Sequence, residues 1–138
     1  MKESHLRCQR ILEYSACHLR GRSSRSAPIG VADLADVKAG TNPEELIAAA
    51  HSSCFTMALA FQLTGANLEP TELKTTATVS MDKQDAGWTI TAIHLDVTGN
   101  VPGIDATKFQ ELAETAKQNC PVSKALSATP ITMTAKLL

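Results

Sequence analysis

Two cysteines stand out as residues whose type and position could do redox chemistry. Cys54 lies midway along a mostly apolar stretch from Gly40 to Leu63, and Cys120 comes much later, directly before Pro121. The thiolate, and not the neutral thiol, attacks peroxides and disulfides, so the surroundings that set the pKa decide whether a cysteine reacts. We therefore take these two thiols as the candidate chemistry of the chain.

The Cys-Pro step gives a local argument for an activated thiol at Cys120. Pro121 suits the first position of a helix, which places Cys120 at the N-cap, where free N–H groups and the helix dipole favour a thiolate. A thiol with a pKa of about 8.5 is only a few per cent ionised at pH 7, and lowering the pKa to ~6 would make it mostly thiolate. A buried cysteine that simply ends a helix fits this step equally well.

Cys54 taken alone is more typical of a small core residue, because it lies on the apolar face of a predicted helix. Ser52 and Ser53 add small polar groups beside the thiol. His51, three residues earlier, could act as a base, although its position is more typical of a polar residue at the helix surface. Glu44 lies ten residues earlier, or about 15 Å along a helix, so it could act on Cys54 only through an arginine that bridges the gap.

The stretch around Cys54 predicts a long central helix. Asn42 can cap its free N–H groups, and Pro43 is well tolerated at the first helical position. Glu44 and Glu45 suit the positive end of the helix dipole, and Gly65 is a natural stop. Residues at helical spacing form the apolar stripe that we expect to face the core: Leu46, Ala50, Cys54, Met57 and Phe61.

The remaining chain predicts an α+β domain with an antiparallel sheet packed on this helix. Alternation of apolar and polar residues over 73–81 and 88–98, around a turn-rich link, predicts an antiparallel hairpin. Asp105 is placed to cap a second helix, with Ile104 and Phe109 as a hydrophobic staple. Two further elements are a short helix over 121–126 and a strand over 131–137.

The N-terminal part of the chain differs from the rest in composition. All five arginines lie in residues 1–30, where six cations stand against two carboxylates for a net charge of +4; the rest of the chain carries −5. A loose helical pattern runs from Leu6 to Leu19. We expect residues 1–35 to form an atypical basic segment and residues 36–138 to form the domain.

Composition excludes several classes of function. The net charge of −1 gives no electrostatic case for binding nucleic acid or an anionic membrane. We see no apolar run near the ~20 residues of a membrane span and no signal peptide, so we expect a cytoplasmic protein. In a reducing compartment, thiols serve catalysis or metal binding more often than structural disulfides. No Cys-x-x-Cys pair occurs, and we expect no metal site.

Three segments resemble the OsmC/Ohr superfamily, the osmotically inducible and organic-hydroperoxide-resistance proteins. They are Gly40–Leu63, Val101–Asp105 (Val-Pro-Gly-Ile-Asp) and Cys120–Leu126 (Cys-Pro-Val-Ser-Lys-Ala-Leu). The resemblance covers about residues 36–138 in matching order. Asn-Pro-Glu-Glu-Leu, followed by Ala-Ala-His-x-x-Cys-Phe, is more similar to the OsmC branch than to the Ohr branch.

The resemblance implies an intertwined α+β homodimer and a stress-response antioxidant activity, the reduction of organic hydroperoxides to alcohols. Cys54 matches the peroxidatic cysteine, which becomes a sulfenic acid, and Cys120 matches the resolving cysteine, which closes a disulfide with it. Glu44 matches the carboxylate that positions the family's arginine. No metal or flavin is implied, and a dithiol such as a dihydrolipoyl group on a reductant protein would regenerate the enzyme.

The chain departs from the family at that arginine. The family has it roughly six residues before Gly-Thr-Asn-Pro-Glu-Glu-Leu, where this chain has Leu34, and no arginine follows Arg25. Arg25 or Arg22 could substitute for it. The alternative is a catalytically impaired homodimer that binds a small apolar ligand or has a structural role.

Overall fold

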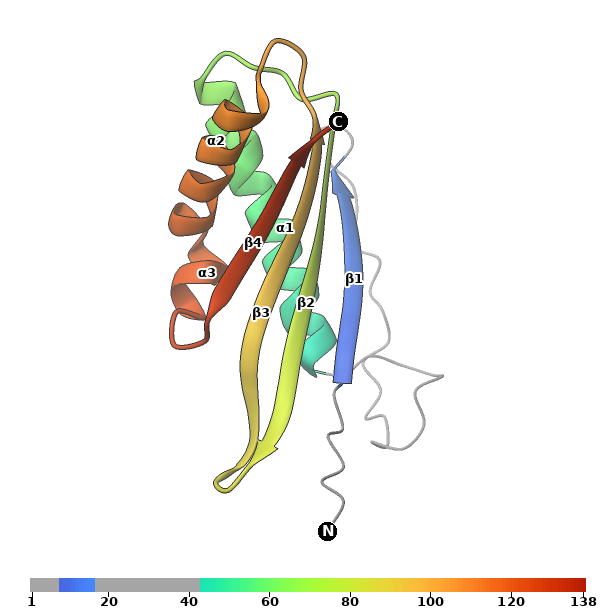
Figure 1. Ribbon diagram of the computed structural model, residues 1–138, viewed down its shortest axis with the longest axis vertical. Helices are drawn as coiled ribbons and strands as arrows, with labels where there is room; N and C mark the ends of the chain where they lie inside the picture. Colours follow the sequence, from blue (N-terminus) through green and yellow to red (C-terminus); the bar gives the residue numbers. More distant parts are fainter. Residues whose placement is uncertain (1–7, 17–42) are drawn as a thin grey trace.

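Four strands form one sheet, and three helices cover one of its faces, in the parts of the chain that the computed structural model describes, residues 8–16 and 43–138 (Figure 1). This two-layer arrangement confirms the predicted α+β class. The elements in chain order are β1 (Cys8–Ala16), α1 (Pro43–Gly65), β2 (Glu72–Gln84), β3 (Gly87–Asn100), α2 (Ala106–Asn119), α3 (Pro121–Ala125) and β4 (Ile131–Leu137).

The sheet is mixed, which corrects the predicted antiparallel sheet. Its strand order is β1-β2-β3-β4; β1 and β2 pair antiparallel, β2 and β3 pair antiparallel, and β3 and β4 pair parallel. The chain passes from β3 to β4 through α2 and α3. A helical crossover of this kind returns the chain to the sheet in the same direction, so the last strand runs parallel to its neighbour.

The predicted hairpin is confirmed as β2 and β3. Thr75 pairs with Val97, and Val79 pairs with Ile93. The side chains of these four residues are buried, as are those of their neighbours at alternate positions. One face of the hairpin therefore lies against the helices, as the period of two in the sequence indicates.

The loose helical pattern over residues 6–19 does not correspond to a helix where the structure describes it. Cys8–Ala16 is a strand whose Cα partners run from Cys8↔Met81 to Ala16↔Leu73 along β2. The edge of β2 that lies away from β3 pairs with these nine residues in an antiparallel ladder, in which alternate residues exchange backbone hydrogen bonds. A weak helical period in the sequence does not outweigh that gain.

The long helix that carries Cys54 is confirmed as α1, but our prediction of which face of it is buried is wrong. Ala50 is exposed, and Met57 and Phe61 have exposed fractions of 53% and 72%. Since α1 is apolar on more than one side, the spacing of apolar residues cannot tell which side meets the sheet. The expected cap, Asn42, lies outside the described residues. The buried residues of α1 are Ala48, His51, Ser52, Phe55, Thr56, Leu59 and Leu63.

α1 also corrects the expectation that no apolar run approaches the length of a membrane span. Within residues 43–138 and 8–16 it is the one helix that is long and apolar enough to cross a membrane, with a mean hydropathy of 1.4. Length and composition alone support this, and the core helix of a globular domain meets the same criteria. Here α1 packs against β1, β2, α2 and α3.

The elements after the hairpin follow the sequence prediction closely. The Asp105 side chain accepts a hydrogen bond from the Lys108 N–H at 2.8 Å and caps α2. Phe109 is buried and Ile104 is partly buried against the core, as a hydrophobic staple requires. Pro121 occupies the start of α3, so α2 and α3 meet at Cys120.

Candidate functional site

The two candidate thiols meet, although they lie 66 positions apart in the chain. Cys54 is half-buried midway along α1, and Cys120 is completely buried at the junction of α2 and α3. Both are free thiols, and their side chains form a hydrogen bond with each other. The packing of α3 against α1 therefore brings together the residues that the sequence singled out.

α3 also contributes a backbone donor to this site. The N–H of Val122 donates a hydrogen bond to the sulfur of Cys54. The first N–H groups of a helix have no partner within the helix, so they are free to bind an acceptor from outside. The helix start that Pro121 sets thus provides both a thiol and an N–H group to Cys54.

The pKa of Cys54 lies above its ordinary value. Burial raises it most, the Val122 N–H lowers it, and the neighbouring Cys120 thiol raises it again as a hydrogen-bond partner and as a charge. No arginine lies in residues 43–138, and Arg10 is the one arginine within β1. The described contacts of Cys54 therefore favour its neutral form.

The predicted place of Cys120 at a helix start is confirmed. Its N–H donates to the carbonyl oxygen of Ala116 at 2.8 Å, and its own carbonyl accepts from the Lys124 N–H at 3.0 Å. The Cys120 side chain makes no capping hydrogen bond to α3. Its thiol instead meets Cys54 on α1.

His51 is completely buried, so the expected surface position is wrong. Its Nε2 lies 2.8 Å from the Oγ of Ser123 on α3, and burial lowers its pKa. Its Nδ1 has no hydrogen-bond partner within the described part of the chain. Packing of α3 over this side of α1 explains the burial, which a pattern within one helix cannot predict.

The structure leaves the third candidate residue away from the thiols. Glu44 lies in the first turn of α1, partly exposed, ten residues before Cys54. That separation is about 15 Å along the helix axis, too far for direct contact. Arg22 and Arg25 lie outside the described residues.

Sequence reasoning missed the Val122 N–H and Ser123 as parts of the site. Both belong to the Cys120–Leu126 segment, which is one of the three segments that carry the family resemblance. What it lacked was any indication that this segment packs against the middle of α1.

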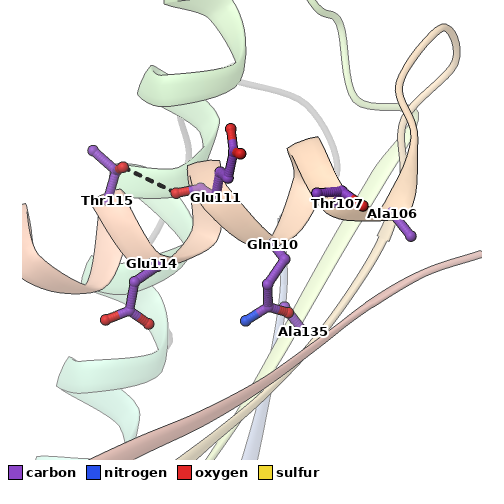
Figure 2. A pocket seen from close by; sticks show the side chains of 7 residues that line it. All are labelled: Ala106, Thr107, Gln110, Glu111, Glu114, Thr115 and Ala135. Atoms are coloured by element: carbon purple, nitrogen blue, oxygen red, sulfur yellow. Dashed lines mark hydrogen bonds between the residues drawn. The ribbon is translucent and has the colours of Figure 1, made fainter.

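Neither a metal-binding cluster nor a described hollow lies at the two thiols, within the part of the chain that the structure describes. No group of three or more His, Cys, Asp or Glu side chains in residues 8–16 and 43–138 could hold a metal ion. An open hollow of about 760 Å³ lies between the outer face of α2 and β4, where Gln110 points toward Ala135 (Figure 2). Neither cysteine lines it.

Comparisons with known proteins agree on one family. A sequence model of the family described as OsmC-like protein matches residues 35–136. Peroxiredoxin OsmC of Escherichia coli K12 is 50% identical over 101 residues, which cover 73% of this chain and 71% of that protein. The organic hydroperoxide resistance protein OhrB of Bacillus subtilis is 36% identical over 87 residues, or 62% of each chain.

Solved structures show the same fold. The crystal structure of OhrB from Bacillus subtilis matches with a TM-score of 0.61 and 32% identity, covering 73% of each chain. The OsmC-like protein from Mycoplasma pneumoniae matches with a TM-score of 0.65 and 14% identity, covering 100% of this chain and 99% of that one. The second likeness concerns the fold alone.

Proposed function

This chain belongs to the OsmC-like protein family, and we propose that it is a thiol peroxidase that reduces organic hydroperoxides to alcohols. Its relatives are named peroxiredoxin and organic hydroperoxide resistance protein, which supports a peroxidase-type redox role. The observation that carries the proposal is the hydrogen bond between the Cys54 and Cys120 thiols, with one thiol partly open and the other buried.

The proposed cycle uses both sulfurs. The Cys54 thiolate attacks the distal oxygen of the hydroperoxide, the O–O bond breaks, and the alkoxide takes a proton to leave as an alcohol. Cys54 is then a sulfenic acid. The Cys120 thiol attacks the Cys54 sulfur, a disulfide forms, and the sulfenic oxygen leaves as water.

An external dithiol would complete the cycle by thiol–disulfide exchange and would itself become a disulfide. We propose a reductant protein that carries a dihydrolipoyl group for this step. The chemistry needs no metal, because sulfur supplies both electrons. A cytoplasmic location suits a cycle that returns to free thiols.

We propose Arg25, or Arg22, as the cation that activates Cys54, with Glu44 orienting it. The described surroundings of Cys54 raise its pKa, so a thiolate at neutral pH needs a positive charge from elsewhere. Arg25 and Arg22 lie between β1 and α1 in the chain, in the atypical basic segment that we propose over residues 1–35, before the family domain that we propose over residues 36–138.

We also propose that two copies of the chain form an intertwined homodimer. The apolar side of α1 that faces away from the sheet includes Leu46, Met57 and Phe61, all of them exposed. A helix that is apolar on both sides is typical of a buried helix, so a second copy is the occupant that would complete its burial.

The central test is a count of free thiols before and after one equivalent of cumene hydroperoxide. We expect each chain to lose two thiols within seconds and peptide mapping to find a Cys54–Cys120 disulfide. Loss of no thiol, or a disulfide that joins other cysteines, would contradict the proposed cycle.

Single substitutions separate the two roles. Cys54→Ser should abolish turnover. Cys120→Ser should still form one sulfenic acid per chain, which a dimedone probe detects, but no intramolecular disulfide. Equal loss of the first, single-turnover step in both variants would contradict the assignment.

The raised pKa of Cys54 favours a second candidate function, a catalytically impaired homodimer that binds a small apolar ligand or has a structural role. In that case cumene hydroperoxide would consume no thiol rapidly, while the homodimer would still form. The thiol count therefore decides between the two candidates.

A further inference from the structure

A second contact joins the same two helices that carry the thiols. His51 lies three residues before Cys54 on α1, and Ser123 lies three residues after Cys120 on α3. The His51 Nε2 and the Ser123 Oγ are 2.8 Å apart, and both side chains are buried. Since residues three apart lie on one side of a helix, the two helices are joined by two contacts about one turn apart.

The direction of this hydrogen bond follows from burial. His51 is neutral, because burial disfavours the charged ring. A proton on Nδ1 would leave an unpaired N–H inside the protein, because Nδ1 has no partner among the described residues. The proton therefore lies on Nε2, and His51 donates to the Ser123 hydroxyl.

We propose that His51 and Ser123 are positioning residues that hold α3 against α1, and thereby favour closure of the Cys54–Cys120 disulfide. The Cys120 thiol and the Val122 N–H both meet the Cys54 sulfur, so by themselves these two contacts leave α3 free to turn about that one atom. A second contact one turn away removes that freedom, and it raises the effective concentration of one thiol near the other. The disulfide is the one in the proposed cycle, but the inference does not depend on which oxidant forms it.

Equilibration of the full chain in glutathione buffers tests this inference without any peroxidase assay. Two protein thiols and one oxidised glutathione give one protein disulfide and two reduced glutathiones. Alkylation and peptide mass spectrometry then measure the fraction of Cys54–Cys120 disulfide. We expect Ser123→Ala to lower the equilibrium constant for oxidation about tenfold. A tenfold change equals a potential about 30 mV less negative.

Two further variants show that the lost contact, and not general destabilisation, is the cause. Thr56 lies two residues after Cys54, and its buried Oγ1 is 2.8 Å from both the Ser52 carbonyl oxygen and the Thr75 Oγ1 on β2. Thr56→Val therefore removes a buried hydroxyl from α1 without touching α3, and it should stay within about twofold of the native constant. His51→Gln keeps an N–H donor, so its equilibrium constant for oxidation should lie closer to that of the native chain than the constant of Ser123→Ala does.

Three outcomes would overturn the inference. The first is an equilibrium constant for oxidation that is the same in Ser123→Ala and Thr56→Val. The second is a Cys54–Cys120 disulfide that is more stable in Ser123→Ala than in the native chain. The third is a His51→Gln substitution that changes the constant as much as Ser123→Ala does. If instead the glutathione titration behaves as expected and cumene hydroperoxide oxidises no thiol, the positioning role holds and the proposed peroxidase function fails.

Discussion

At the scale of single residues, the balance of contacts around Cys54 decides its chemistry. Burial and the neighbouring Cys120 thiol raise its pKa, and one N–H group of Val122 opposes them. A raised pKa means that the thiolate forms only at higher pH. The described contacts thus hold Cys54 near its partner but leave it mostly neutral at pH 7.

This argument predicts how the reactivity of Cys54 changes with pH. In the double variant Arg22→Ala/Arg25→Ala, the rate of alkylation by iodoacetamide should rise about tenfold per pH unit between pH 6 and 8, in proportion to the thiolate fraction. If Arg25 or Arg22 activates Cys54, as we propose, the native chain should react faster at pH 7 and show a flatter profile, because a guanidinium beside a thiol lowers its pKa. Peptide mass spectrometry follows the modification of Cys54 over time.

Arg20→Ala is the matched control, since it removes a cation from the same basic segment, and its profile should overlay that of the native chain. Identical profiles for the native chain and the double variant would exclude Arg22 and Arg25 as the activating cation.

His51 makes the stability of the fold depend on pH. Its pKa is lowered in the folded chain and returns to about 6.5 on unfolding, so the unfolded chain binds a proton first as pH falls. The contribution of neutral His51 to the free energy of unfolding is fully present above pH ~6.5. Below that pH it decreases by up to about 1.4 kcal/mol per pH unit, and the decrease ends at the pKa of His51 in the folded chain.

Urea unfolding at pH 7.5 and pH 5.5 measures this dependence. The native chain should lose more free energy of unfolding between the two pH values than His51→Gln does, because glutamine does not titrate. The same loss in both chains would show that His51 is not the group responsible.

At the scale of elements, α2 is fixed on the sheet by a close approach that only glycine allows. A Cβ added to Gly99 of β3 would lie 2.6 Å from the Cζ and 2.7 Å from the Cε2 of Phe109. Phe109 is buried, so its ring would have to shift among the core side chains to make room. Gly99 therefore sets the distance between β3 and the helix that leads to Cys120.

We expect Gly99→Ala to lower the free energy of unfolding by about 1–3 kcal/mol, as overpacking of a core does. Chemical denaturation measures the change. Gly65→Ala is the matched control, because its added Cβ meets nothing within 4 Å at the end of α1. It should leave stability unchanged or raise it slightly. Equal effects of the two substitutions would contradict the packing argument.

At the scale of the whole molecule, α1 presents an apolar side that the described chain does not cover. Met57 and Phe61 are among the exposed large apolar residues, on a helix whose opposite side lies against the sheet. If a second copy covers this side, as we propose, charge placed there must weaken the pair, because a charge buried without a partner is costly.

The double variant Met57→Glu/Phe61→Glu should therefore sediment as a monomer at micromolar concentration, whereas the native chain sediments as a dimer. Glutamate keeps a high helix propensity, so α1 should still form. Gln110→Glu is the control and should remain dimeric, because Gln110 is exposed on α2 and points toward Ala135 of β4 rather than lying on α1. A native chain that sediments as a monomer would exclude the proposed homodimer.

The sequence by itself predicted most of the helices and strands, and it singled out Cys54 and Cys120 as the candidate thiols. Pro43, Asp105 and Pro121 mark helix starts through local chemistry that needs no tertiary contact, and all three are found at helix starts or caps. The alternation over 73–81 also identified the face of β2 that is buried, because residues at a period of two lie on one face of a strand. The predicted catalytic roles of Cys54 and Cys120, and the predicted roles of Glu44, Arg22 and Arg25, remain predictions.

Only the tertiary structure decided how these elements meet. It turned the last strand parallel to β3, made Cys8–Ala16 a strand, and buried His51 against Ser123 rather than exposing it. Each outcome depends on partners distant in the chain: a strand takes its hydrogen bonds from a neighbour, and a helix is buried on whichever side another element covers. A period in the sequence records that a face is apolar, but the packing of the whole chain chooses what lies against it.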